Sequence, residues 1–207
     1  MSLKKIVVIF VLVGALIVFG VQIRKTYFYN PDKVIGQAID SLKGVRVYYN
    51  GGVNHVGKRN LTVDNYNLGL EYQCVEFVKR YYFERFQHRM PDSYGNAKDF
   101  FDQQLADGEV NKKRALLQFK NPSVLPPETD DLLVYSPTIW NRFGHVAIVA
   151  AVYTDSIEII QQNPGPNAAT RERYALRKFE GKWQIDNSRI YGWLRVIDEN
   201  NTEMVTQ

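Results

Sequence analysis

The sequence has one cysteine, Cys74, among its 207 residues. A single thiol cannot form an intrachain disulfide, and it cannot build a cysteine-based metal site. The chain must therefore fold around ordinary apolar side chains, and its 45% hydrophobic and 13% aromatic content supplies enough of them. The thiol itself has two interpretations at this point: a small buried apolar side chain, or a nucleophile.

Features of nucleic-acid and cofactor binding are also scarce. The net charge is only +4, and the longest run of basic residues is the triplet at 112–114. The sequence contains neither a Gly-rich phosphate loop nor a His-rich metal cluster. We therefore expect no nucleic-acid partner, no metal and no other cofactor. A mild positive charge is compatible with an anionic polymer such as a bacterial cell wall.

One long hydrophobic run occupies residues 6–21 and contains no polar side chain. As a helix it would span about 24 Å, slightly less than the roughly 30 Å hydrocarbon core of a bilayer. Lys4 and Lys5 precede the run and Arg24 and Lys25 follow it, and such side chains can extend to the membrane surface. A core helix of a soluble protein is a poor alternative, because this helix would be apolar on every face.

The run is either an uncleaved signal anchor or a cleaved signal peptide. It is long for a signal peptide, and Val18 and Gly20 make a weak cleavage site. We therefore favour the anchor, with secretion after cleavage as the alternative. A short N-terminal stub with two lysines normally stays in the cytoplasm, so the rest of the chain would lie outside it.

The remaining sequence predicts helices first and strands later. Asn30 before Pro31 predicts the start of a short helix that ends near residue 43, and a helix from about residue 72 carries apolar side chains at three-to-four spacing. Residues 53–69 are polar and irregular, which predicts a loop. Strands are expected at 45–49, 132–135, 146–152, 157–162, 173–179 and 190–196. This order predicts an α+β fold with an antiparallel sheet.

Cys74 falls at or near the start of the second predicted helix. The unpaired N–H groups and the dipole at a helix N-terminus favour a negative charge, and therefore the thiolate form of the side chain. The same N–H groups can stabilise the oxyanion of a tetrahedral intermediate. This position suits a nucleophile on both counts.

A thiol nucleophile needs a base, and the chain has three histidines. His55 lies in the polar loop, and His88 lies at the far end of the Cys74 helix, about four turns from the thiol. His145 opens an apolar strand directly after Gly144. A polar residue at the mouth of a buried strand is typical of an active site, although a capped strand-end histidine would look the same.

The base in turn needs a group that orients it. In the strand predicted at 157–162, side chains two residues apart share one face. Gln161 and the following Asn163 share that face, whereas Glu158 lies on the other. An amide oxygen can accept the imidazole N–H, so both Gln161 and Asn163 remain possible.

Five sequence blocks together resemble the CHAP family of cysteine amidases and peptidases, and within it the branch formed by the amidase domains of glutathionylspermidine synthetase/amidase. The blocks are YQCVEFVKRYY at 72–82, YGNAKDF at 94–100, DLLVY at 131–135, GHVAIV at 144–149 and QQN at 161–163. They occur in the family's order. The resemblance implies a papain-like (NlpC/P60-type) fold, with Cys74 as nucleophile and His145 as base.

The resemblance covers most of the chain and sets the predicted domain bounds. They are a signal anchor or peptide at 1–25, a linker and short helix at 26–43, the hydrolase domain at 44–198 and a tail at 199–207. One position departs from the family pattern, because Gln161 stands where a glutamate is often found. A neutral amide would orient the imidazole but stabilise the imidazolium less than a carboxylate would.

Three functions follow as hypotheses. The first is thioester-mediated hydrolysis of peptide or amide bonds in peptidoglycan, favoured by the export segment. The second is an amidase acting on glutathione–polyamine conjugates, which the resemblance favours and the membrane segment opposes because such substrates are cytosolic. The third is a non-catalytic module that binds the cell wall.

Overall fold

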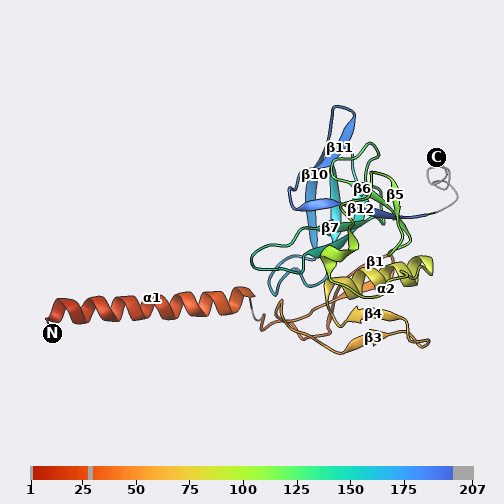
Figure 1. Cartoon of the computed structure of the whole chain (residues 1–207). Coiled ribbons are helices and arrows are strands. Elements are labelled where there is room, and N and C mark those ends of the chain that lie inside the picture. The colour runs from red at the N-terminus through yellow and green to blue at the C-terminus, as the bar shows by residue number, and fades with distance from the viewer. Residues whose placement is uncertain (1, 28–29, 198–207) are drawn as a thin grey trace.

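The structure is a computed structural model that describes residues 2–27 and 30–197 (Figure 1). The tail predicted at 199–207 lies outside these residues. Helix α1, Leu3–Tyr27, has 25 residues and extends away from the rest of the chain. Its segment Leu3–Ile23 is long and apolar enough to cross a membrane, and none of it is buried against the domain. The helix is longer than the apolar run of the sequence indicates.

The domain is built on one eight-stranded antiparallel sheet. Its strand order is β11-β10-β9-β8-β7-β12-β6-β5. The strands are β5 Glu109–Asn111, β6 Leu116–Lys120, β7 Leu132–Tyr135, β8 His145–Val152, β9 Ser156–Ile160, β10 Arg171–Phe179, β11 Lys182–Ile185 and β12 Ile190–Val196. Strands β8, β9 and β10 are antiparallel neighbours. The start of β8, the end of β9 and the start of β10 therefore lie together at the same end of these strands.

Helix α2, Cys74–Phe86, packs on one face of this sheet beside two hairpins. One hairpin pairs β1, Ala38–Leu42, with β2, Val45–Tyr48, and the other pairs β3, Arg59–Leu61, with β4, Asn67–Leu70. A short 3₁₀ turn, η1, covers Ala97–Phe100. The fold is mixed α+β with a large antiparallel sheet, as the sequence predicts.

Alternation along the central strands explains why both faces of the sheet are buried. On β8, Val146 and Ile148 point into the core beneath α2, whereas Ala147 and Val149 point into a second core on the opposite face. Side chains two residues apart share a face of a strand. The first core also holds the apolar face of α2, namely Phe77, Val78, Tyr81 and Tyr82.

The structure corrects two expectations from the sequence. The prediction of a helix within 26–43 is wrong. Ala38–Leu42 is instead strand β1, because its backbone pairs with β2 in an antiparallel hairpin. Part of the loop expected at 53–69 is the β3–β4 hairpin. Strands β5 and β6 are not among the strands expected from the sequence. Since β1 pairs with β2, we propose that the domain begins before residue 38 rather than at residue 44.

Candidate active site

Cys74 is the first residue of α2 and is half-buried. Gln73 precedes it in extended conformation and provides no side-chain cap to the helix. The backbone N–H groups of Val75, Val146 and Cys74 itself interact with the thiol. The sulfur therefore lies among N–H donors from the helix start and from β8.

A buried polar network fixes this end of α2. Glu76, in the first turn, accepts hydrogen bonds from Arg80 at 2.6 Å, Asn60 at 2.9 Å and Gln162 at 2.8 Å. Gln162 also donates to the Gln73 carbonyl at 3.0 Å. Gln162 is thereby hydrogen-bonded to Gln73, just before Cys74, and to Glu76, just after it. These bonds hold the segment that follows β9 against the start of α2.

Gly69 permits the close packing of β4 against this turn. Its φ is +134°, and a Cβ at this position would lie 3.0 Å from the Glu76 Cα. A side chain would therefore displace the backbone of α2 two residues from the thiol. Gly144 has a comparable role before His145, since its φ is +76° and a Cβ would lie 2.7 Å from the Tyr135 carbonyl oxygen.

His145 is the first residue of β8 and is half-buried, and one of its ring nitrogens is hydrogen-bonded to Gln161. Its Nε2 lies 2.9 Å from Oε1 of Gln161, a side chain that is 4% exposed. The Gln161 amide nitrogen donates to the Ala169 carbonyl at 3.2 Å and to Glu172 Oε1 at 2.9 Å. Because both of those groups only accept, the Gln161 oxygen must face the imidazole. His145 Nε2 is then the N–H donor, and Nδ1 is the free, basic nitrogen.

Among the hydrogen bonds of the described residues, Asn163 makes none to the imidazole. It has a left-handed φ of 56°, and its amide nitrogen donates to Gln73 Oε1 at 2.8 Å and to the Val53 carbonyl at 3.2 Å. Of the two possible partners left open by the sequence, Gln161 is the one hydrogen-bonded to His145. Asn163 instead braces the residue that precedes the thiol.

Burial controls the resting charges of the pair. It raises the pKa of Cys74 to about 11, and the surrounding backbone N–H groups offset only part of this effect. It lowers the pKa of His145 to about 4, against the opposing effect of the Gln161 hydrogen bond. Both groups are therefore neutral near pH 7. A resting thiolate, expected from the helix N-terminus alone, is not favoured, because desolvation outweighs the helix effect.

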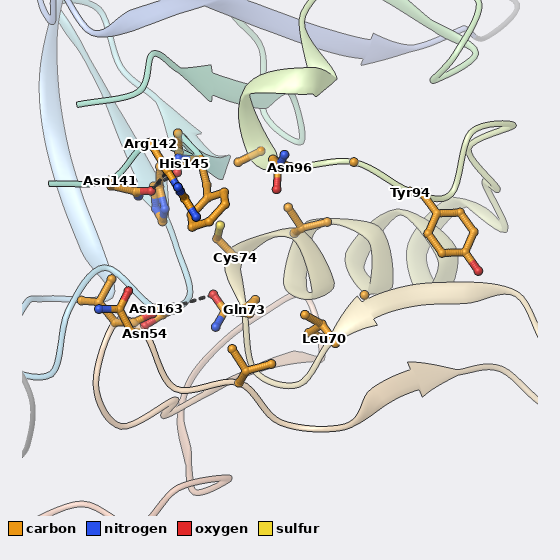
Figure 2. A pocket seen from close by; sticks show the side chains of 18 of the residues that line it. Asn54, Leu70, Gln73, Cys74, Tyr94, Asn96, Asn141, Arg142, His145 and Asn163 are labelled. Carbon is orange, nitrogen blue, oxygen red and sulfur yellow. Dashed lines mark hydrogen bonds between the residues drawn. The ribbon is translucent and has the colours of Figure 1, made fainter. Parts of the chain in front are cut away.

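Cys74 and His145 line one cavity of about 650 Å³. Figure 2 shows the Cys74 sulfur pointing toward the segment that carries Arg142 and His145, with Gln73 and Asn163 joined on the other side of the thiol. The β3–β4 hairpin and the loop at 139–143 form opposite walls, and Ile139 and Trp140 on that loop are 90% and 84% exposed. The cavity is large enough for a peptide-sized group, and the thiol belongs to its lining.

Neither of the other two histidines is among the described residues that line this cavity. His55 is exposed, and its carbonyl accepts a hydrogen bond from Gln73. The ring of His88 is bonded to the Arg114 carbonyl. No sequence pattern indicates Trp140 in the cavity lining or Glu172 as a hydrogen-bond partner of Gln161. Both acquire their positions from tertiary contacts rather than from spacing along the chain.

Residues 64–163 match the CHAP domain, and all four sequence-predicted site residues lie inside the match. The chain therefore carries a CHAP domain, the class that the α+β fold and the cysteine–histidine pair indicate. It is 31% identical over 151 residues to trypanothione synthetase of Crithidia fasciculata. It is 28% identical over 152 residues to the bifunctional glutathionylspermidine synthetase/amidase of Escherichia coli strain K12. These matches cover 72% and 68% of this chain.

The chain spans only 22% and 24% of the length of those two relatives. The similarity is therefore to one region of larger proteins. Among solved structures, the wild-type endolysin LysIME-EF1 aligns with 71% of this chain and 62% of its own, at 18% identity and a TM-score of 0.38. A similarity at that level carries no argument about substrate.

Proposed function

We propose that this domain is a cysteine-dependent amide hydrolase that acts through a thioester, with Cys74 as nucleophile and His145 as general base. The observation that carries the proposal is the hydrogen bond from His145 Nε2 to Gln161. It leaves Nδ1 as the only ring nitrogen able to take the thiol proton, in a cavity that both side chains line. We further propose that the fold is papain-like, of the NlpC/P60 type.

The neutral resting pair defines the order of proton transfers. As the Cys74 sulfur attacks the amide carbonyl carbon, the thiol proton passes to His145 Nδ1. The amine then leaves with that proton, and a thioester remains on Cys74. Water attacks the thioester while Nδ1 accepts its proton, and return of this proton to sulfur releases the acid and restores the thiol. Gln161 orients the imidazole throughout.

For the substrate, we propose peptide or amide bonds of peptidoglycan. The support is the apolar helix α1, since a signal anchor or signal peptide would place the domain outside the cytoplasm, where peptidoglycan lies. A glutathione–polyamine conjugate is the second candidate, supported by the similarity to glutathionylspermidine synthetase/amidase. We favour the first because conjugates of that kind are cytosolic.

The test uses the full chain purified in detergent. Wild-type protein and Cys74→Ala are incubated with isolated peptidoglycan and, separately, with glutathionylspermidine, and new amines and carboxyls are measured. We expect release from peptidoglycan by the wild type only. Release from the conjugate alone would favour the second candidate. Binding of peptidoglycan without turnover of either substrate would contradict both enzymatic functions and favour a non-catalytic module that binds the cell wall.

Membrane attachment has its own test in cells that make the full chain. We expect the protein to resist alkaline extraction from membranes and its domain to be digested by protease added from the non-cytoplasmic side. A soluble protein shortened by the length of α1 would instead indicate cleavage and secretion.

A further inference from the structure

Glu172 lies behind the residue that orients His145. It is in β10, and its Oε1 accepts a hydrogen bond from the Gln161 amide nitrogen at 2.9 Å. Its other oxygen accepts from the Tyr174 hydroxyl. Glu172 is not one of the described residues that line the cavity, and its link to the site is the hydrogen bond to Gln161.

An amide can reverse its two ends by rotation, and only the partners at its far end decide which end faces the imidazole. With its nitrogen toward Glu172 and the Ala169 carbonyl, Gln161 presents oxygen to His145. With the amide reversed, its NH₂ would face His145 Nε2. That nitrogen would then have to accept, and the ring proton would move to Nδ1, where it would block proton transfer from Cys74.

Without Glu172, the Ala169 carbonyl would be the remaining acceptor for the Gln161 amide nitrogen, and it would favour the observed amide orientation less strongly. That carbonyl is 3.2 Å from the amide nitrogen, whereas the Glu172 carboxylate is at 2.9 Å and carries a charge. Hydrogen bonds to ionised acceptors are roughly twice as strong as neutral ones. Glu172 also contributes favourably to protonation of the imidazole, in opposition to Arg189.

We propose that Glu172 is a positioning residue that fixes the Gln161 amide and thereby holds His145 in the Nε2–H tautomer. The carboxylate that Gln161 lacks is thus supplied one residue further away, from the neighbouring strand. This inference rests on the proposed function for its catalytic consequence, but the tautomer of His145 can be observed without any substrate.

The experiment is nitrogen NMR of the full chain in detergent micelles with ¹⁵N-labelled histidine. Only three histidines contribute, and His145→Gln identifies its signals. We expect wild-type His145 in the Nε2–H form. Glu172→Ala should shift its tautomer toward Nδ1–H and lower the activity by about tenfold. Glu172→Gln, which keeps an acceptor oxygen, should retain the wild-type tautomer, so simple structural damage is distinguishable. Glu84→Ala, an exposed glutamate on α2, is the matched control.

An Nδ1–H form in the wild type would overturn the proposal, as would an unchanged tautomer in Glu172→Ala. A tautomer shift in Glu172→Ala without any wild-type hydrolysis would support the positioning role and count against the proposed function. The two claims can therefore fail separately.

Discussion

Asn163 is hydrogen-bonded to Gln73, the residue before the thiol, and not to His145; its amide nitrogen lies 2.8 Å from Gln73 Oε1. Gln161, two residues earlier, is hydrogen-bonded to the imidazole at 2.9 Å. Gln161 thus contacts the proposed base itself, whereas Asn163 contacts the residue that precedes the proposed nucleophile. Their substitutions should have different consequences.

Asn163→Ala should leave the His145 tautomer unchanged and destabilise the loop before α2. It removes two hydrogen bonds, to Gln73 and to the Val53 carbonyl, each worth about 1 kcal/mol. Gln161→Ala should instead release the imidazole. Denaturant unfolding and histidine NMR on both variants separate the effects; a tautomer change in Asn163→Ala would contradict the assignment.

Exchanging Gln161 and Glu172 should preserve the hydrogen-bonded chain that runs from His145 through position 161 to position 172, with the carboxylate and the amide in exchanged places. Gln161→Glu alone places two carboxylates at hydrogen-bond distance from each other, so we expect loss of activity near neutral pH. The double variant Gln161→Glu/Glu172→Gln puts a carboxylate directly on His145 and an amide behind it. Its kcat/KM should exceed that of the Gln161→Glu single variant by about tenfold or more. Equal activity of the single and double variants would argue against coupling of the two positions.

Alkylation of Cys74 should report its raised pKa. Because burial raises this pKa to about 11, the iodoacetamide rate should keep rising as pH increases through 7, 8 and 9. Cys74 is the sole cysteine, so intact mass measures its modification directly. A plateau near pH 6 would instead show a resting thiolate–imidazolium pair and contradict the neutral resting state.

His145 should make folding stability depend on pH in the acid range. Its pKa is lowered from 6.5 to about 4 in the folded state, so the unfolded chain binds more protons between those values. Its contribution is therefore fully present above pH 6.5 and is lost as pH falls toward 4, by up to about 3 kcal/mol. His145→Gln should remove this slope. Parallel pH dependence in wild type and variant, measured by urea unfolding, would contradict it.

Glu76→Ala should be among the most destabilising substitutions near the site. It leaves Arg80, 7% exposed, without its ion-pair partner, and it also removes acceptors for Asn60 and Gln162. Breaking a buried pair in this way costs about 3–5 kcal/mol. The control is Glu84→Ala on the exposed side of the same helix, which should change the unfolding midpoint little.

The sequence predicted the central elements well because their patterns are strong. A continuous apolar run defines β7, a stretch rich in aromatic and aliphatic residues defines β12, and three-to-four spacing defines α2. Strand β1 was mistaken for a helix because its apolar residues also fit helical spacing, and only pairing with β2 decides the matter. Hairpin β3–β4 is short and polar, so its pattern resembles a loop.

The residues of the site likewise divide into those that local sequence patterns indicate and those that only tertiary contacts reveal. Cys74 and His145 are predicted from their places at the starts of a helix and a strand, and the strand pattern restricts the orienting residue to Gln161 or Asn163. The choice between those two depends on which amide meets the imidazole across strands. Glu172 comes from β10, whose register against β9 no local spacing reveals.

The central claim is that Cys74 forms the thioester and His145 Nδ1 moves its proton. Its most direct test is acid-quenched intact mass spectrometry of the full chain with peptidoglycan fragments, followed by mapping of the adduct. We expect a hydroxylamine-labile acyl group on the Cys74 peptide of the wild type, and no acyl group in Cys74→Ala or His145→Gln. Hydrolysis by Cys74→Ala at the wild-type rate would contradict it.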